Sequence, residues 1–181
     1  MRMDGLLILG AGGYGRTVAE AARAIGGFDR IVFLDDSLRG EEILGRCARA
    51  AEYRGKYRYA YPAFGDNMLR ADWMGRLEYM MGYELPVLIH PRAYVSPSAR
   101  IAAGAVVLAM AAVGTNTVIS RGAIVNMGAI VDHDCTVGAC AHLAPGAIVK
   151  AGNNIPARVK VDSGCVIERG AVFQFEEGTH V

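Results

Sequence analysis

Apolar residues recur with two different periods along the chain, and the change between them falls near Pro86. Before Pro86, short continuous apolar runs alternate with segments of helical spacing. Such runs are typical of strands buried in a parallel sheet, so this half predicts a βαβ unit with an extension. The expected elements are a strand at 6–9, a helix at 17–25, a strand at 31–34, a strand around 57–64 and a helix around 68–81.

After Pro86 a large apolar residue returns every six positions without an interruption of the register, and a small or compact residue usually follows it four positions later. A helix cannot use this period, because successive apolar residues would rotate steadily around its axis. The large apolar positions are Val95, Ile101, Val107, Val113, Ile119, Val125, Val131, Val137, Leu143, Val149, Ile155, Val161, Ile167 and Phe173.

A parallel β-helix accommodates a period of six, because each hexad forms one short side of a coil and glycine serves the corner. Three hexads close a triangular coil, so the repeats predict about four coils stacked roughly 4.8 Å apart. The sequence therefore predicts two domains, at 1–85 and 86–181. The outward alanines, valines and isoleucines of the repeats leave apolar faces that association of identical subunits would bury.

Composition and charge narrow the function classes. The chain is 52% hydrophobic and 20% charged with a net charge of +1, which predicts a well-buried core and argues against a nucleic-acid partner. Its four cysteines have neither a C-x-x-C pair nor zinc spacing, so they are expected to be reduced thiols. With no signal peptide and no long apolar stretch, we expect a cytoplasmic protein without a membrane segment.

The glycine-rich segment 10–15 (GAGGYG) directly follows the first strand and opens the first helix. Glycines let the backbone approach a phosphate, and a helix N-terminus supplies N–H groups for it. Asp35 follows the second strand, where a dinucleotide site would bind a ribose hydroxyl. An NAD site is therefore one interpretation and a tight turn without a ligand is another, although 85 residues are few for a complete dinucleotide fold.

The histidines of the repeats are the candidate catalytic groups. His133 lies between Asp132 and Asp134, and His142 is the last residue of the next hexad; neither is expected to point into the core. A carboxylate beside an outward imidazole can fix its tautomer and support it as a general base. The alternative is that both histidines are merely exposed corner residues. Two histidines nine residues apart do not make a zinc tripod, so no metal is expected.

These motifs together resemble the hexapeptide-repeat sugar acetyltransferases that carry an N-terminal nucleotide-sugar-binding domain, including bacillosamine-pathway UDP-4-amino-sugar N-acetyltransferases and sialic acid O-acetyltransferase-like proteins. The carriers of the resemblance are the GAGGYG loop, Phe33–Asp36, Gly65–Asn67, Leu88–Pro91, Ser96–Ala99 and Val131–Cys135 with His142. The resemblance implies a small Rossmann-like α/β domain followed by a left-handed parallel β-helix.

The resemblance also implies an activity: acetyl-CoA-dependent N-acetylation of a UDP-linked amino sugar, by direct transfer without a covalent intermediate, in a homotrimer. It implies His133 as the general base with Asp134 beside it, and a contact between His142 and the acetyl group. Gly146 is expected to contact the pantetheine arm. The implied nucleotide-sugar contacts are Gly12, Gly13, Tyr14, Asp35, Asp36, Gly65 and Asn67.

Two departures from the family pattern keep alternatives open. Tyr14 stands where the family often has histidine, and the repeats become less regular after Asn153, which suggests fewer coils than in relatives. A sugar O-acetyltransferase and a non-catalytic nucleotide-sugar-binding homologue with an eroded coenzyme A site are therefore alternatives.

Overall fold

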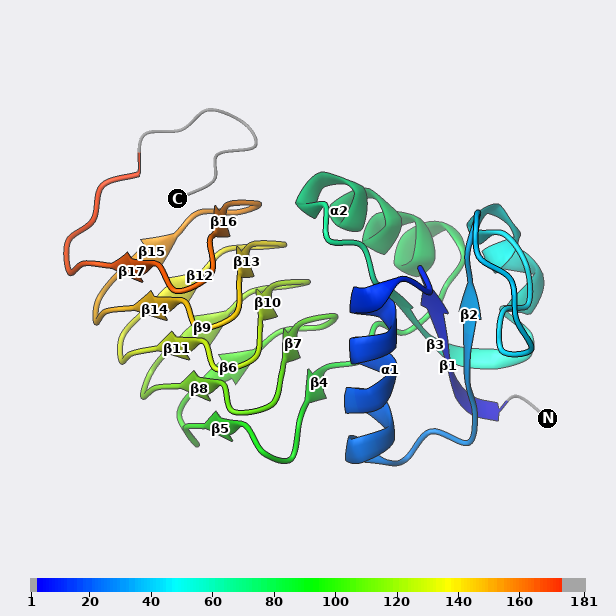
Figure 1. Cartoon of the computed structure of the whole chain (residues 1–181), viewed down its shortest axis with the longest axis horizontal. Coiled ribbons are helices and arrows are strands. Elements are labelled where there is room, and N and C mark those ends of the chain that lie inside the picture. The colour runs from blue at the N-terminus through cyan, green and yellow to red at the C-terminus, as the bar shows by residue number, and fades with distance from the viewer. Residues whose placement is uncertain (1–2, 174–181) are drawn as a thin grey trace. The chain divides into compact units, whose positions relative to one another are not determined.

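The computed structural model describes residues 3–173, and the chain divides into two compact units, Met1–Pro86 and Val87–Val181. The first unit combines a small sheet with helices, and the second is a stack of short strands joined by turns (Figure 1).

The N-terminal unit is built on a three-stranded parallel sheet of order β2-β1-β3. The apolar run Leu6–Leu9 lies in the central strand and is completely buried, as expected for a strand covered on both faces. The elements of this unit are β1 (Met3–Leu9), α1 (Gly13–Ile25), β2 (Ile31–Leu34), the 3₁₀ helix η1 (Cys47–Tyr53), β3 (Tyr57–Pro62), α2 (Asn67–Gly75) and the π-helical segment η2 (Arg76–Met80).

The two helices begin in different ways. α1 starts at Gly13, earlier than the predicted 17–25, because part of the glycine-rich segment forms its first turn instead of a loop. α2 is capped by Asp66, whose carboxylate accepts a hydrogen bond from the Leu69 N–H at 2.7 Å. The second predicted helix corresponds to α2 and η2 together, whereas nothing in the apolar pattern indicated η1.

The C-terminal unit is a parallel β-solenoid of about four turns with three sheets, β4-β7-β10-β13-β16, β5-β8-β11-β14-β17 and β6-β9-β12-β15. Paired strands lie 18 residues apart: Ile130 pairs with Ala112 on one side and Ile148 on the other. The strands are β4 (Leu88–Ile89), β5 (Tyr94–Val95), β6 (Arg100–Ile101), β7 (Val106–Val107), β8 (Ala112–Val113), β9 (Val118–Ile119), β10 (Ile124–Val125), β11 (Ile130–Val131), β12 (Thr136–Val137), β13 (His142–Leu143), β14 (Ile148–Val149), β15 (Asn154–Ile155), β16 (Lys160–Val161) and β17 (Val166–Ile167).

The second residue of each strand points into the solenoid. Val113, Val131 and Val149 are at most 1% exposed and stack in one column, together with small residues such as Ala129 and Ala147. The prediction of parallel coils of three hexads each is therefore confirmed. The stack is consistent with the left-handed β-helix that the resemblance implies.

Residues with a positive φ mark corners of the solenoid. Most are glycines, for which this conformation carries no steric cost, but five are not. Asparagine and aspartate are the residues that tolerate the left-handed conformation best after glycine. The five non-glycine positions are Met110, Asn116, Asp134, Cys140 and Arg158.

Candidate functional site

His133 and Asp134 form the turn between β11 and β12. The His133 Nδ1 lies 2.6 Å from the Asp134 Oδ2, and both side chains are more than half exposed. The hydrogen bond to His133, aided by one from Asn116, lowers the pKa of Asp134, which therefore remains a carboxylate near neutral pH. A carboxylate on Nδ1 favours the tautomer with its proton there and leaves the basic lone pair on Nε2. This is the arrangement that a general base requires.

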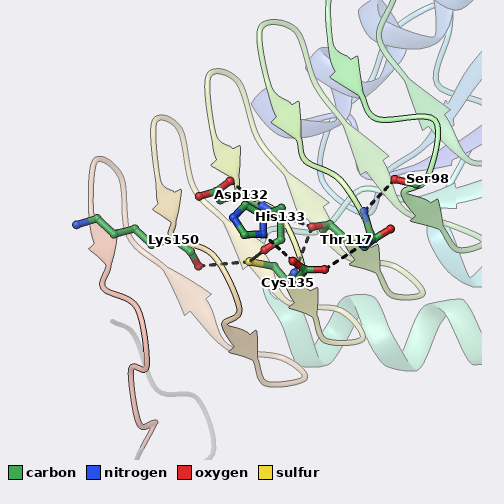
Figure 2. Close-up of polar contacts among 8 residues, drawn as sticks. Ser98, Thr117, Asp132, His133, Cys135 and Lys150 are labelled. Atoms are coloured by element: carbon green, nitrogen blue, oxygen red, sulfur yellow. Dashed lines mark hydrogen bonds and ion pairs between the residues drawn. The ribbon is translucent and has the colours of Figure 1, made fainter.

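The preceding coil supports this turn from inside the solenoid (Figure 2). The hydroxyl of the fully buried Thr117 donates to the Asp132 carbonyl at 2.7 Å and accepts from the Cys135 N–H at 3.3 Å. The backbone N–H of Asp134 donates to the Thr115 carbonyl at 2.8 Å. Hydrogen bonds before, within and after the His133–Asp134 pair therefore hold the turn to the coil beneath it.

His142 is the first residue of β13 and is only 9% exposed, so it is not an exposed corner residue. Its Nε2 lies 3.1 Å from the Asn126 Nδ2. Because the Asn126 Oδ1 accepts the Met127 N–H at 2.8 Å, the amide nitrogen faces the ring and donates to Nε2. The His142 ring is then neutral with its proton on Nδ1. Its contact with an acetyl group stays a prediction; in this structure Nε2 faces Asn126 and Nδ1 is buried.

Asn126 was not among the residues predicted for the site. The signal available in the sequence was its position directly after an inward valine, 16 residues before His142 and thus almost one coil away. Gly146 has a φ of 70°, and its N–H donates to the Met127 carbonyl at 3.0 Å. The N–H of Gly146 is therefore engaged within the solenoid, which leaves its carbonyl and its lack of a side chain for the predicted contact to a pantetheine arm.

In the N-terminal unit, the glycine-rich segment forms one wall of a pocket of about 420 Å³. A side chain on Gly15 would overlap the Gly10 carbonyl oxygen, so the third glycine of the motif permits the helix to approach the sheet. The pocket brings together five predicted contacts with residues that were not predicted. Its lining is Gly10, Gly12, Gly13, Tyr14, Gly15, Asp35, Ala63, Phe64, Gly65, Asp66 and Leu69.

Asp35 fixes the shape of this pocket. One carboxylate oxygen accepts the Ala11 N–H at 2.8 Å, and the other accepts the N–H groups of Ser37 and Leu38 at 2.9 and 2.7 Å. Burial alone would raise the pKa of Asp35, but the three N–H donors outweigh it and lower the pKa. Asp35 therefore has a structural role, because it anchors the glycine-rich segment to the end of β2 whether or not it also contacts a ligand.

Two other predicted contacts, Asp36 and Asn67, do not line the pocket. The Asp36 carboxylate accepts the Cys47 N–H at 3.0 Å and so holds the start of η1. The Asn67 Oδ1 accepts a hydrogen bond at 2.7 Å from Arg70, whose guanidinium also donates to the Phe64 carbonyl at 3.0 Å. Arg70 is completely buried and was not predicted. It ties the start of α2 to the loop that forms one side of the pocket.

Tyr14 lines the pocket, but its hydroxyl lies 2.8 Å from that of Tyr61. Burial, followed by the neighbouring Tyr61, raises the pKa of Tyr14 well above its ordinary value, so the phenol is neutral at any physiological pH. The side chain is therefore a neutral hydrogen-bonding group held from behind, and it cannot serve as a titrating base as a histidine could.

Two of the cysteines, Cys47 and Cys135, are poor nucleophiles. Burial raises the pKa of Cys47 to about 11, and burial also raises the pKa of Cys135, whose Sγ donates to the His133 and Lys150 carbonyls. The four cysteines, all within the described residues, form no disulfide bond. Between residues 3 and 173, no three histidine, cysteine or acidic side chains gather as metal ligands. Over the same residues, no helix is both long and apolar enough to span a bilayer.

Comparisons with known proteins agree with these features. Residues 5–77 match the family model "PglD N-terminal domain". The acetyltransferase domain of PglB from Neisseria gonorrhoeae FA1090 is 33% identical, with a TM-score of 0.82, and the match covers 98% of this chain and 95% of that one. The same domain has also been solved in complex with acetyl coenzyme A, at 34% identity, a TM-score of 0.77, and coverage of 93% and 94%. A search of curated proteins found no match.

PerB from Caulobacter crescentus, solved in complex with CoA and GDP-perosamine, is 34% identical with a TM-score of 0.78, and the match covers 91% of this chain and 89% of that one. At this identity and coverage, the chain belongs to the hexapeptide-repeat sugar N-acetyltransferases, a family of acyltransferases. The expectation of fewer coils than in relatives does not hold for the Neisseria domain, because the match spans almost all of it.

Proposed function

We propose that this protein transfers the acetyl group of acetyl-CoA to the amine of a UDP-linked amino sugar. The observation that carries the proposal is the His133–Asp134 pair, whose 2.6 Å hydrogen bond orients an imidazole at an exposed turn of the solenoid. Two relatives support the proposed classes of acyl donor and acceptor: one is solved with acetyl coenzyme A and another with CoA and GDP-perosamine.

We assign the two substrates to the two parts of the chain. We infer a Rossmann-like nucleotide-sugar-binding domain at 1–85, because its parallel sheet has the glycine-rich segment between the central strand β1 and the start of α1, where doubly wound folds bind phosphate. The first-turn N–H groups of α1, which have no partner within the helix, would bind the diphosphate. We infer that the C-terminal unit, which the structure describes to residue 173, is a left-handed β-helix that holds acetyl-CoA and carries the base.

The reaction then follows from proton positions. The His133 Nε2 removes a proton from the sugar amine as the nitrogen attacks the thioester carbonyl. The tetrahedral intermediate carries an oxyanion that needs a donor, and the Asn126–His142 pair supplies one, because the Asn126 amide carries a second N–H beyond the one directed at His142. Collapse of the intermediate breaks the C–S bond and forms the amide, and the departing CoA thiolate takes the proton that His133 accepted. No enzyme-bound acyl group is formed.

We further propose that the active protein is a homotrimer. The outward residues of the sheet that contains β11 form an apolar face: Tyr94, Ile130 and Val166 are 62, 43 and 45% exposed, and Ala112 and Ile148 lie between them. This face leads directly into the turn that carries His133. Association through it would bury exposed apolar area and place His133 at the edge of a cleft between subunits.

A thiol-release assay tests the proposed reaction. Acetyl-CoA is offered with a panel of UDP- and GDP-linked amino sugars and their hydroxyl analogues to the wild type, His133→Asn and His90→Asn. The His90 change is a matched control, because asparagine preserves an acceptor for the Arg92 N–H that now bonds to the His90 Nδ1. We expect turnover with an amino sugar, a loss of about 10² or more in His133→Asn, and normal turnover in His90→Asn.

Other outcomes of the same assay contradict the proposal. Turnover only with hydroxyl acceptors would indicate a sugar O-acetyltransferase. An absence of thiol release, combined with stabilisation of the protein by a nucleotide sugar, would indicate a binding module without catalysis. Undiminished turnover in His133→Asn would exclude His133 as the base.

A further inference from the structure

Three successive coils are linked at one corner of the solenoid by a series of hydrogen bonds that ends at His133, and the first of these bonds uses a backbone N–H. The Ser98 Oγ accepts the Asn116 N–H at 3.0 Å, and the Asn116 Nδ2 donates to the Asp134 Oδ1 at 3.2 Å. The other oxygen of Asp134 is the one bonded to His133. The spacing is 18 residues from Ser98 to Asn116 and from Asn116 to Asp134, so these hydrogen bonds run along the direction in which the coils stack (Figure 2).

The fold does not need an asparagine side chain at this corner. Asn116 has a φ of 56°, and the equivalent corners of the later coils are occupied by Gly152 and Gly170, with φ of 73° and 76°. Glycine therefore satisfies the backbone in this column at least as well as asparagine does. The carboxamide of Asn116 is thus a feature added to the corner, and the contact that it makes across the coils is with Asp134.

The contact controls the orientation of a side chain that packing does not restrain. The Asp134 carboxylate is 57% exposed, so burial does not select its rotamer. With the Asn116 amide on one oxygen, the second oxygen is directed at the His133 Nδ1. The same amide contributes, after His133 itself, to lowering the pKa of Asp134.

We propose that Asn116 is a positioning residue, which holds the Asp134 carboxylate in the orientation that keeps His133 in its Nδ1–H tautomer. This inference rests on the proposed role of His133 as the base, and Asn116 acts only through Asp134. Its removal should slow the chemical step while leaving substrate binding unchanged.

The test compares Asn116→Gly, Asn116→Asp and Met110→Gly. Glycine deletes the amide and tolerates the positive φ, whereas aspartate retains the shape but directs a second carboxylate at Asp134. Met110 is 70% exposed with a φ of 62°, so Met110→Gly makes the same backbone change at a different corner. The tautomer of His133 is read from its ring ¹⁵N chemical shifts, and kcat and KM are measured for both substrates.

In Asn116→Gly we expect loss of the Nδ1–H preference and a fall in kcat of about tenfold, less than the full contribution of a general base, with each KM within about twofold of wild type. Asn116→Asp should fall at least as far because like charges repel, and Met110→Gly should match the wild type. An unchanged tautomer in Asn116→Gly overturns the proposal, whatever happens to kcat. If no acceptor is turned over by the wild type, the ¹⁵N comparison still decides the positioning role while the proposed function fails.

Discussion

Gly114 lies one coil before the turn that carries the proposed base, and a single methyl group there should displace it. A Cβ added at Gly114 would lie 2.8 Å from the carbonyl carbon of Asp132, 2.9 Å from the His133 nitrogen and 3.1 Å from the Asp132 oxygen. All three are backbone atoms, so no rotamer change can relieve the overlap. Ordinary van der Waals contact begins at 3.4 Å, which requires a shift of about 0.6 Å in the backbone of the turn.

The expected cost follows from this displacement. A misplacement of about 1 Å can cost roughly 10² in rate, so we expect Gly114→Ala to lower kcat by about tenfold or more. Overpacking should also destabilise the fold by about 1–3 kcal/mol. Steady-state kinetics at saturating acetyl-CoA and acceptor measure the first effect, and thermal unfolding measures the second.

Gly138→Ala separates the two effects. A Cβ at Gly138 would meet the backbone of the next coil, including the carbonyl carbon of Pro156 at 2.6 Å, and not the turn that carries His133. This variant should therefore lose stability yet retain kcat. The reasoning fails if Gly114→Ala unfolds at a lower temperature but turns over normally, or if both variants lose the same activity.

Two further predictions concern the pocket and the apolar face. Asp35→Asn should destabilise the protein by about 1 kcal/mol at neutral pH, because an amide cannot accept all three N–H groups. Since the pKa of Asp35 is lowered in the folded protein, the stability difference between wild type and variant should shrink as the pH falls below the unfolded pKa of about 3.9. Denaturant titrations that show the same difference at every pH would contradict this. Ile130→Glu should place a charge on the apolar face and convert the proposed trimer to monomers in sedimentation velocity, with loss of turnover; a trimeric, active variant would exclude this face as the interface.

The solenoid could be predicted from the sequence in detail, because one physical rule governs every coil. The hexad of large apolar residues fixes which side chains point inward, and three hexads fix the pairing of Ile130 with Ala112 and Ile148. The N-terminal elements were less well defined. The glycines suggested a turn through Gly15, although α1 already begins at Gly13. The 3₁₀ helix η1 has no apolar period that would indicate it.

Contacts of the candidate site between adjacent residues could be predicted from the sequence, whereas contacts between stacked coils could not. Adjacent residues His133 and Asp134 are bonded as expected. The residues of the preceding coil that bond to this turn, Asn116 and Thr117, can be identified only when the sequence is aligned in rows of 18 residues. Arg70 could not be predicted, because a completely buried guanidinium is identified by its burial and its hydrogen bonds, neither of which a local pattern shows.

The most direct test of the account is the identity of the product. The protein is incubated with acetyl-CoA and a UDP-linked amino sugar, and the acceptor is analysed by mass spectrometry and NMR. The account predicts one added acetyl group on the amine nitrogen, formed by the wild type and by His90→Asn but greatly reduced with His133→Asn. An acetyl group on a sugar hydroxyl, or an unmodified acceptor under conditions in which the sugar nucleotide binds, would contradict it.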